Sequence, residues 1–228
     1  MDATMKKSKW VGTVVMATVM LAGWGARADV DEDFKFASGL VNYQPPFADF
    51  AQKVVDAVLA KDPSQKDRSR IIQAEILIQR RQYADAESII NEMGMNNPKA
   101  QAISLALARN YFGIGEYDKA RALYDAFFKL YENQKPTDAD VARFYRDAAY
   151  QYAQMLQMIS QFEEAAKSFK RVEEVADGKE MQRSMQVHRA QALVRAAENK
   201  SGDDKNKLLD EARKLCEMIQ WGGMDLQF

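Results

Sequence analysis

Residues 107–127, LARNYFGIGEYDKARALYDAF, carry the pattern from which the fold of this chain can be predicted. Apolar residues recur there at steps of three and four on both sides of Gly115, which places them on one face of an α-helix. Glycine is a frequent turn residue, so Gly115 is expected to separate two helical runs. The stretch therefore predicts two helices joined by a tight turn, with Ala108 in the first helix and Ala120 in the second.

The same pattern occurs at two other places in the chain. The counterparts of Ala120 are Ala86, 34 residues earlier, and Ala165, 45 residues later. The three copies cover residues 67–98, 101–134 and 146–177, and the longer second step implies an insertion of about 11 residues around 134–138. Self-similarity at this period is typical of proteins that stack one helical hairpin on the next.

Weaker units flank the three copies. Upstream, residues 34–42 and 47–61 have helical spacing and are separated by Pro45-Pro46. Downstream, we expect helices over 181–198 and 208–221, separated by a turn or loop over 199–206. The chain is therefore predicted to be all-α, with about five helical hairpins.

These units resemble the tetratricopeptide repeat (TPR) family, which places small residues in both helices of a hairpin and an aromatic residue near the start of the second. The copy at 101–134 matches best, while the copy at 146–177 has Ser160 where a turn glycine is common. The resemblance implies a right-handed α-solenoid in which Ala108 meets Ala120, and in which Tyr111, Tyr117 and Tyr124 fill the surrounding space. A bundle of unrelated helical hairpins is the alternative.

Residues 1–28 are predicted to be a secretory signal peptide. Lys6, Lys7 and Lys9 precede the mostly apolar run 11–21, and Ala26-Arg27-Ala28 has the small-x-small pattern of a cleavage site. We therefore expect cleavage after Ala28 and a periplasmic or secreted protein. An uncleaved segment that anchors the chain in the membrane is the alternative. The remaining chain divides into a solenoid over 29–221 and a tail over 222–228.

Composition excludes several classes of function. The formal charge of the chain is −1, and without residues 1–28 it is −4, because four basic residues and one acidic residue leave with them. This balance argues against a nucleic-acid partner. With one Cys and one His, the chain offers no disulfide framework, no metal centre of several Cys or His ligands and no evident cofactor site. Cys216 is expected to be a small buried residue, and no run after residue 28 predicts a membrane span.

The sequence also offers no catalytic constellation. His188 is solitary and is expected to lie at a surface or an interface. The pairs Glu163-Glu164 and Glu173-Glu174 are adjacent in sequence, so on a helix they diverge and are expected to be solvated. Asp203-Asp204 falls in the predicted loop. Motifs for a nucleophile elbow or a phosphate-binding glycine loop are missing, so we do not predict an enzyme.

The family resemblance implies that the first helices line a concave groove that holds a peptide or a protein segment. The carboxylate clamp of some chaperone-binding members is not matched at these positions. The alternative for the apolar members of the set is that they belong to the core. The positions carried over to the groove are Ile71, Glu75, Ile78, Gln79, Leu105, Arg109, Phe112, Asp147, Tyr150, Gln154, Gln157 and Met158.

The predicted function is therefore that of a non-enzymatic protein-binding scaffold in the cell envelope. The tail 222–228 contains Met224, Leu226 and Phe228 and does not look like a polar capping helix. It either folds back, mediates association or begins a further, truncated repeat. A module that self-associates through this end of the chain is the alternative function.

Overall fold

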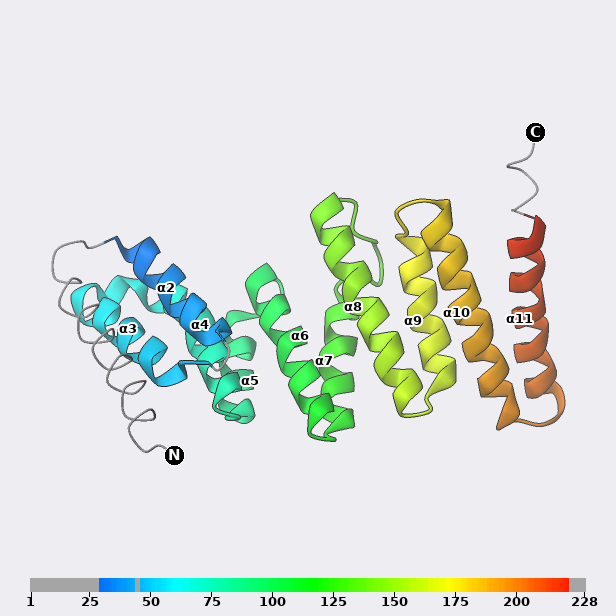
Figure 1. Ribbon diagram of the computed structural model, residues 1–228, viewed down its shortest axis with the longest axis horizontal. Helices are drawn as coiled ribbons and strands as arrows, with labels where there is room; N and C mark the ends of the chain where they lie inside the picture. The colour runs from blue at the N-terminus through cyan, green and yellow to red at the C-terminus, as the bar shows by residue number, and fades with distance from the viewer. Residues whose placement is uncertain (1–28, 44–45, 222–228) are drawn as a thin grey trace, which may run out of the picture. The chain divides into compact units, whose positions relative to one another are not determined.

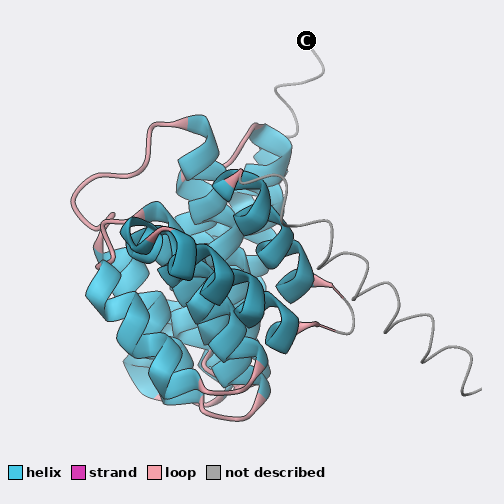
Figure 2. Ribbon diagram, turned by 90° about the vertical axis from the view of Figure 1, so that its left-hand side faces the viewer, coloured by secondary structure: helices cyan, strands magenta, loops and turns pink. Residues whose placement is uncertain are grey.

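The computed structural model describes residues 29–43 and 46–221, and their regular structure is helical (Figure 1). Figure 2 shows helices and connecting loops in this part of the chain and no strand. The prediction of an all-α fold is thus confirmed for the described residues. The predicted signal peptide and the tail 222–228 lie outside them.

The chain divides into two compact units. The first extends to Gly94, and its helices form two hairpins, α2 with α3 and α4 with α5. A 3₁₀ turn at Pro63–Gln65 precedes α4. The helices of this first unit are α2 (Val30–Asn42), α3 (Ala48–Lys61), α4 (Lys66–Gln79) and α5 (Tyr83–Met93).

The second unit begins at Met95 and contains three hairpins, α6 with α7, α8 with α9 and α10 with α11. The described helices therefore form five hairpins, as predicted, while the right-handed path of the solenoid stays a prediction. The helices of this unit are α6 (Pro98–Gly113), α7 (Tyr117–Lys129), α8 (Ala139–Met158), α9 (Phe162–Glu174), α10 (Lys179–Glu198) and α11 (Gly202–Trp221).

Side-chain caps begin several helices. The Asp29 carboxylate accepts from the backbone N–H of Asp31 at 2.9 Å, and Asp138 accepts from two N–H groups at the start of α8. Asn97 caps α6, and Pro98 takes its first position, where no N–H is needed. These residues satisfy backbone donors that have no partner within the helix.

The turns inside the three central hairpins repeat the same geometry. Arg81, Gly115 and Ser160 have φ of 61°, 84° and 61°, and they are separated by the same 34 and 45 residues as the alanines. The next residue in each turn donates its N–H to a carbonyl five residues back, at 2.8 to 2.9 Å. This bond is the one that closes a helix with a left-handed residue. The internal repeat seen in the sequence is therefore a repeat of backbone conformation.

The predicted alanine positions are buried. Ala86, Ala120 and Ala165 are 0%, 1% and 0% exposed, and Ala108 on the facing helix is 0% exposed. Small side chains allow the two helices of a hairpin to approach closely, because a larger side chain would overpack the contact. The predicted burial of these alanines is therefore confirmed, while the direct contact between Ala108 and Ala120 stays a prediction.

Aromatic packing in the second unit is confirmed for two of the three predicted tyrosines. Tyr111 and Tyr124 are buried, but Tyr117 is 44% exposed and rests against Phe112 with ring centroids 5.1 Å apart. Tyr117 is the first residue of α7, where one side of the ring faces solvent. The prediction that it fills the core is therefore wrong.

The last helix differs from its prediction. It begins at Gly202, so Asp203 and Asp204 lie in its first turn and not in a loop, where their charge favours the helix N-terminus. Among residues 202–220 of this helix, Ala212 and Leu215 are buried, whereas Cys216 is exposed. The expected burial of Cys216 is therefore wrong. Helix α10 packs against the face of α11 that carries Ala212 and Leu215, and Cys216 lies beside that face.

The helices also bear on whether the chain could cross a membrane. Within residues 29–43 and 46–221, no helix combines the length and the apolar character that such a span requires.

Candidate functional site

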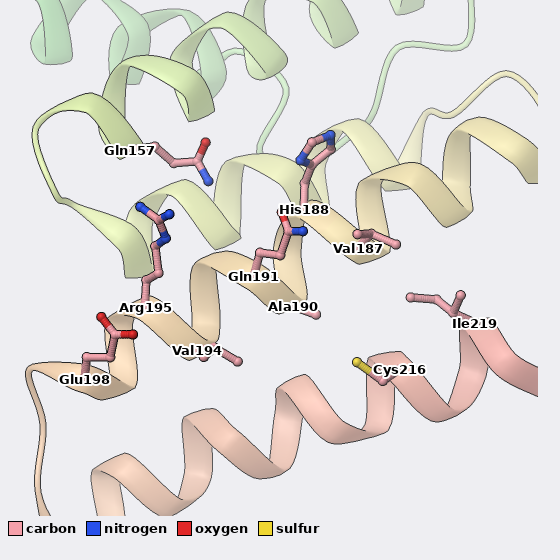
Figure 3. A pocket seen from close by; sticks show the side chains of 10 residues that line it. All are labelled: Gln157, Val187, His188, Ala190, Gln191, Val194, Arg195, Glu198, Cys216 and Ile219. Carbon is pink, nitrogen blue, oxygen red and sulfur yellow. The ribbon is translucent and has the colours of Figure 1, made fainter.

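The second unit has an open pocket of about 820 Å³ on α10, which we call the α10 pocket (Figure 3). Seven lining residues come from α10, two come from α11, and Gln157 comes from the end of α8. The lining residues are Gln157, Val187, His188, Ala190, Gln191, Val194, Arg195, Glu198, Cys216 and Ile219.

The α10 pocket has two sides of different chemistry. On one side Figure 3 shows polar groups: Gln157 across from Gln191 and Arg195. On the other side, which we call the apolar wall, Val187, Ala190 and Val194 face α11, and the side chains of Cys216 and Ile219 point back toward them. Sites that bind small segments commonly combine apolar contact with a few hydrogen-bonding groups, and this pocket offers both.

His188 is held in a cluster of three rings. Its imidazole stacks on Phe169 with centroids 5.2 Å apart and planes 18° apart, and it meets Tyr150 edge-on at 6.2 Å. Tyr150 in turn contacts Phe169 at 6.1 Å. His188 is half-buried, so it lies at an interface between α8, α9 and α10, as predicted. Tyr150 is half-buried, and part of its ring is used in this packing.

An ion-pair network lies beside this cluster. Arg189 donates to Glu173 at 3.2 Å, where both side chains are 14% exposed, and it also contacts Glu211. Gln186 donates its amide to the other oxygen of Glu173 at 2.8 Å. The network joins α9, α10 and α11. Glu173 was expected to be solvated, and this expectation is wrong because two donors from α10 cover its carboxylate.

Arg109 provides an exposed cation on α6. Its guanidinium donates to the amide oxygen of Gln151 at 3.1 Å, and no carboxylate among the described residues pairs with it. It lies near Tyr124, whose hydroxyl is buried and makes no well-formed hydrogen bond with any described residue. Burial raises the pKa of Tyr124, and the nearby guanidinium partly opposes this shift.

The other predicted groove residues of the second unit differ in exposure. Gln154 is exposed and Met158 is 74% exposed, so both are open to a partner. Asp147 is also exposed, and Phe112 is half-buried against Tyr117. Leu105 is 2% exposed and belongs to the core, which is the alternative that the sequence left open.

In the first unit, the predicted residues lie on α4. Ile78 is 6% exposed and belongs to the core, whereas Ile71 is half-buried and Gln79 is exposed. Glu75 is half-buried, and its Oε2 has no hydrogen-bond partner among the described residues. Burial raises the pKa of Glu75, and a hydrogen bond with Ser38 partly offsets the rise.

The α10 side of the pocket was missed by sequence reasoning. Gln191, Val194 and Arg195 lie in the repeat whose pattern is weakest, so no family position was carried over to them. A signal was present, because positions 187, 191, 194 and 198 follow helical spacing and share one face.

The site has no geometry of a metal centre. Within residues 29–43 and 46–220, no group of three or more His, Cys, Asp or Glu side chains could hold an ion. What the arrangement can do is hold an extended or helical segment through apolar contacts, amide hydrogen bonds and a cation.

Comparisons with known proteins identify the repeats. The tetratricopeptide repeat family matches residues 77–144. A crystal structure of TPR-like repeats from a kinesin light chain-like protein of Podosopora anserina has a TM-score of 0.51 at 15% identity, over 84% of this chain and 96% of that chain. A variant of that protein with a single substitution has a TM-score of 0.50 at 14% identity over the same shares.

These likenesses concern the repeats and the fold. No curated protein matches the sequence. The resemblance to the tetratricopeptide repeat family is confirmed by the match at residues 77–144 and by the fold. Repeats of this family generally mediate protein–protein interaction, and proteins with this fold are typically scaffolds without catalytic activity.

Proposed function

We propose that this chain, which carries tetratricopeptide repeats, is a non-enzymatic scaffold that binds a segment of a partner protein along α6, α8 and α10. The observation that carries the proposal is the α10 pocket, in which an amide-rich polar side lies next to the apolar wall. Gln191 is exposed, and Gln157 lies across from it at the end of α8. Such amides can pair with the backbone of an extended segment, while the apolar wall accepts its side chains.

Charge supports a partner with an acidic group. Arg109 is exposed and, among the described residues, donates to a neutral amide and to no carboxylate, while Arg195 lies over the ring of Phe162 at 5.8 Å. An exposed cation of this kind is available for a charge-assisted hydrogen bond. A partner segment with an acidic residue beside apolar residues would therefore complement this face.

Site-specific crosslinking tests the proposal. A photo-crosslinking residue at Gln191 should capture one discrete partner from the source cells, and Arg109→Ala combined with Gln157→Ala should abolish the capture. A crosslinker at Lys167, which is exposed on α9, serves as the matched control. Equal capture from both positions, or capture that survives the double substitution, would show that this face does not bind the partner.

We further propose that the scaffold acts outside the inner membrane, in the periplasm or beyond it. The support is the basic start, apolar run and small-x-small site within residues 1–28. The protein recovered from cells should begin at Asp29 on N-terminal sequencing. A recovered protein that retains Met1 in a membrane fraction would favour the uncleaved anchor instead.

A further inference from the structure

The insertion that lengthens the repeat period helps to build another pocket in the second unit. It lies in the connection between α7 and α8, residues 130–138. Side chains of this connection and of α7, α8 and α9 surround an open pocket of about 390 Å³, which we call the loop pocket. The loop pocket shares no lining residue with the α10 pocket, so an inference about it does not depend on the proposed binding of a partner segment.

Two buried aromatic side chains line the loop pocket. Phe128 and Tyr145 are 4% and 1% exposed, and their rings meet edge-on with centroids 5.4 Å apart. Lys135 of the connection donates to the Tyr145 hydroxyl at 3.3 Å and pairs with Glu174 of α9 at 2.9 Å. These interactions attach the connection to α8 and α9, and they give the pocket a defined shape.

Arg171 of α9 is the lining cation best suited to hold an anion. Its side chain is half-buried, and its guanidinium lies over the ring of Phe128, 4.5 Å from the centroid. This contact with the face of a ring uses none of the five N–H donors in a conventional hydrogen bond. No carboxylate among the described residues pairs with Arg171. A guanidinium held in this way can donate two N–H groups to the two oxygens of one carboxylate.

Two other charged lining residues are already paired within the protein. Lys135 has Glu174 as its partner. Asp125 lies 3.9 Å from the guanidinium of Arg121 and accepts a hydrogen bond from the Tyr152 hydroxyl at 3.2 Å. Lys135 and Asp125 therefore contribute little net charge to the pocket.

The remaining charged residues leave the loop pocket with one net positive charge. Lys129 and Arg171 are cations without an ion pair in the described part of the chain, and Glu132 is an exposed carboxylate. A ligand with a single negative charge would balance this sum. Ionised carboxylates only accept hydrogen bonds, so a ligand that lies beside Asp125 and Glu132 must also carry donors.

We propose that the loop pocket binds a small monocarboxylate that also carries hydroxyl groups, such as a sugar acid. Its carboxylate pairs with Arg171 and Lys129, and its hydroxyl groups donate to Asp125 and Glu132. Ligand pockets generally measure about 300–1,000 Å³, so a pocket of about 390 Å³ suits a molecule with one sugar ring. A phosphate dianion fits less well, because the two carboxylates repel its second negative charge.

D-Glucuronate is the probe for this site, because it has one carboxylate and several hydroxyl groups. Its dissociation constant for the full chain is measured at pH 7 by ligand-observed NMR titration. D-Glucose, which lacks the carboxylate, and acetate, which lacks the hydroxyl groups, are compared in the same assay. Both should bind at least about tenfold more weakly than glucuronate, because each loses hydrogen bonds to charged groups.

Substitutions show which cations hold the carboxylate. Arg171→Gln and Lys129→Gln should each weaken glucuronate binding by about tenfold. Lys170→Gln removes the same charge at the neighbouring exposed position of α9 and is the matched control, which should leave the affinity unchanged. Circular dichroism checks that each variant is folded. Lys129 is exposed, so its variant tests the site even where Arg171→Gln does not fold.

The outcomes separate specific binding from general attraction. Selective binding of glucuronate that is weakened in both pocket variants and kept in Lys170→Gln supports the proposal. Equal binding of glucose would overturn it, because the cations would then have no role. Equal binding of acetate would also overturn it, because the acceptors Asp125 and Glu132 would then have none. An absence of glucuronate binding to the full chain, or equal weakening by Lys170→Gln, would likewise overturn it.

Discussion

At the scale of single residues, the turn positions show how the fold tolerates imperfect repeats. Arg81 and Ser160 adopt the positive φ that Gly115 adopts in the best copy. A non-glycine residue in the left-handed region is disfavoured by about 1–2 kcal/mol. The backbone geometry of the hairpin therefore dominates over the local preference of these two residues.

This strain predicts that glycine stabilises the imperfect turns. Arg81→Gly and Ser160→Gly should each raise the free energy of unfolding by about 0.5–1 kcal/mol, because the relief of strain exceeds the extra entropy of glycine in the unfolded chain. Urea denaturation followed by circular dichroism measures the change. Ser88→Gly, at an exposed position inside α5, is the control and should destabilise by about 0.5 kcal/mol, because glycine is a poorer helix former than serine. A loss of stability at both turns would contradict the account.

Glu75 is a second residue whose native environment is unfavourable, because its carboxyl group is partly buried. Its carboxyl is half-buried with one unpartnered oxygen among the described residues, and burial raises its pKa in the folded state. Because the pKa of Glu75 is higher in the folded state than in the unfolded state, the ionised carboxylate is less stable in the folded protein than in the unfolded chain. Stability contributed by the protonated form is thus present at low pH and is lost as pH rises through the folded pKa.

Replacing Glu75 by Gln should therefore stabilise the protein near neutral pH. The melting temperature of Glu75→Gln should exceed that of the wild type at pH 7, and the difference should shrink as pH falls through the raised pKa of Glu75 and be smallest below the usual pKa of a glutamate. Thermal melts across this pH range measure it. Glu92→Gln, at an exposed glutamate of α5 that pairs with Arg70, serves as a comparison and should not raise the melting temperature. If the melting temperature of the wild type rose relative to that of Glu75→Gln with increasing pH, the predicted direction of the effect would be wrong.

At the scale of elements, pairing of the two helices in a hairpin depends on small residues. Ala120→Leu should destabilise the protein by about 1–3 kcal/mol, because the larger side chain overpacks the buried contact. Ala126→Leu makes the same change at an exposed position of α7 and should alter stability by less than about 0.5 kcal/mol. Chemical denaturation distinguishes them, and equal effects would show that the alanine does not mediate the contact.

The three helices at the end of the second unit are joined by a polar network. Arg189→Ala should destabilise by about 3–5 kcal/mol, because it leaves the largely buried Glu173 carboxylate without its cation. Arg213→Ala removes an exposed ion pair with Asp210 and should change stability by less than about 1 kcal/mol. Denaturation midpoints provide the comparison. A small effect at Arg189 would mean that water replaces the guanidinium.

At the scale of the whole molecule, the division at Gly94 suggests that the second unit can fold alone. It contains three hairpins and its own core, including Tyr124, Phe127 and Tyr145. Three or more stacked hairpins are generally sufficient for a stable repeat array. A fragment of residues 95–228 should therefore show a helical circular dichroism spectrum and a cooperative melt. A spectrum typical of an unfolded chain would indicate that the second unit depends on the first.

Prediction from sequence succeeded wherever the information was local. The helical spacing, the turn at Gly115 and the burial of Ala86, Ala120 and Ala165 follow from contacts within one hairpin, and all were confirmed. The starts of the helices were less exact, as in α11, because Gly202 and its aspartates resemble a loop until the first turn of the helix is seen.

The candidate site was less predictable. Leu105 and Arg109 are one helical turn apart and both were assigned to the groove, yet one is buried and the other exposed. Periodicity identifies a helix face, but which neighbour covers that face depends on the packing of other helices. The same reason explains Gln191 and Val194, because their helical spacing marks a shared face of α10 but does not show that this face is exposed.

The amino-acid sequence alone was sufficient to establish the repeating hairpin, because small residues and turns act over a few positions along the chain. The chemistry of the α10 pocket, the burial of Glu173 and the exposure of Cys216 became visible only in three dimensions. Each of these depends on side chains from separate helices, and the burial of a side chain is determined by the neighbours that surround it in space.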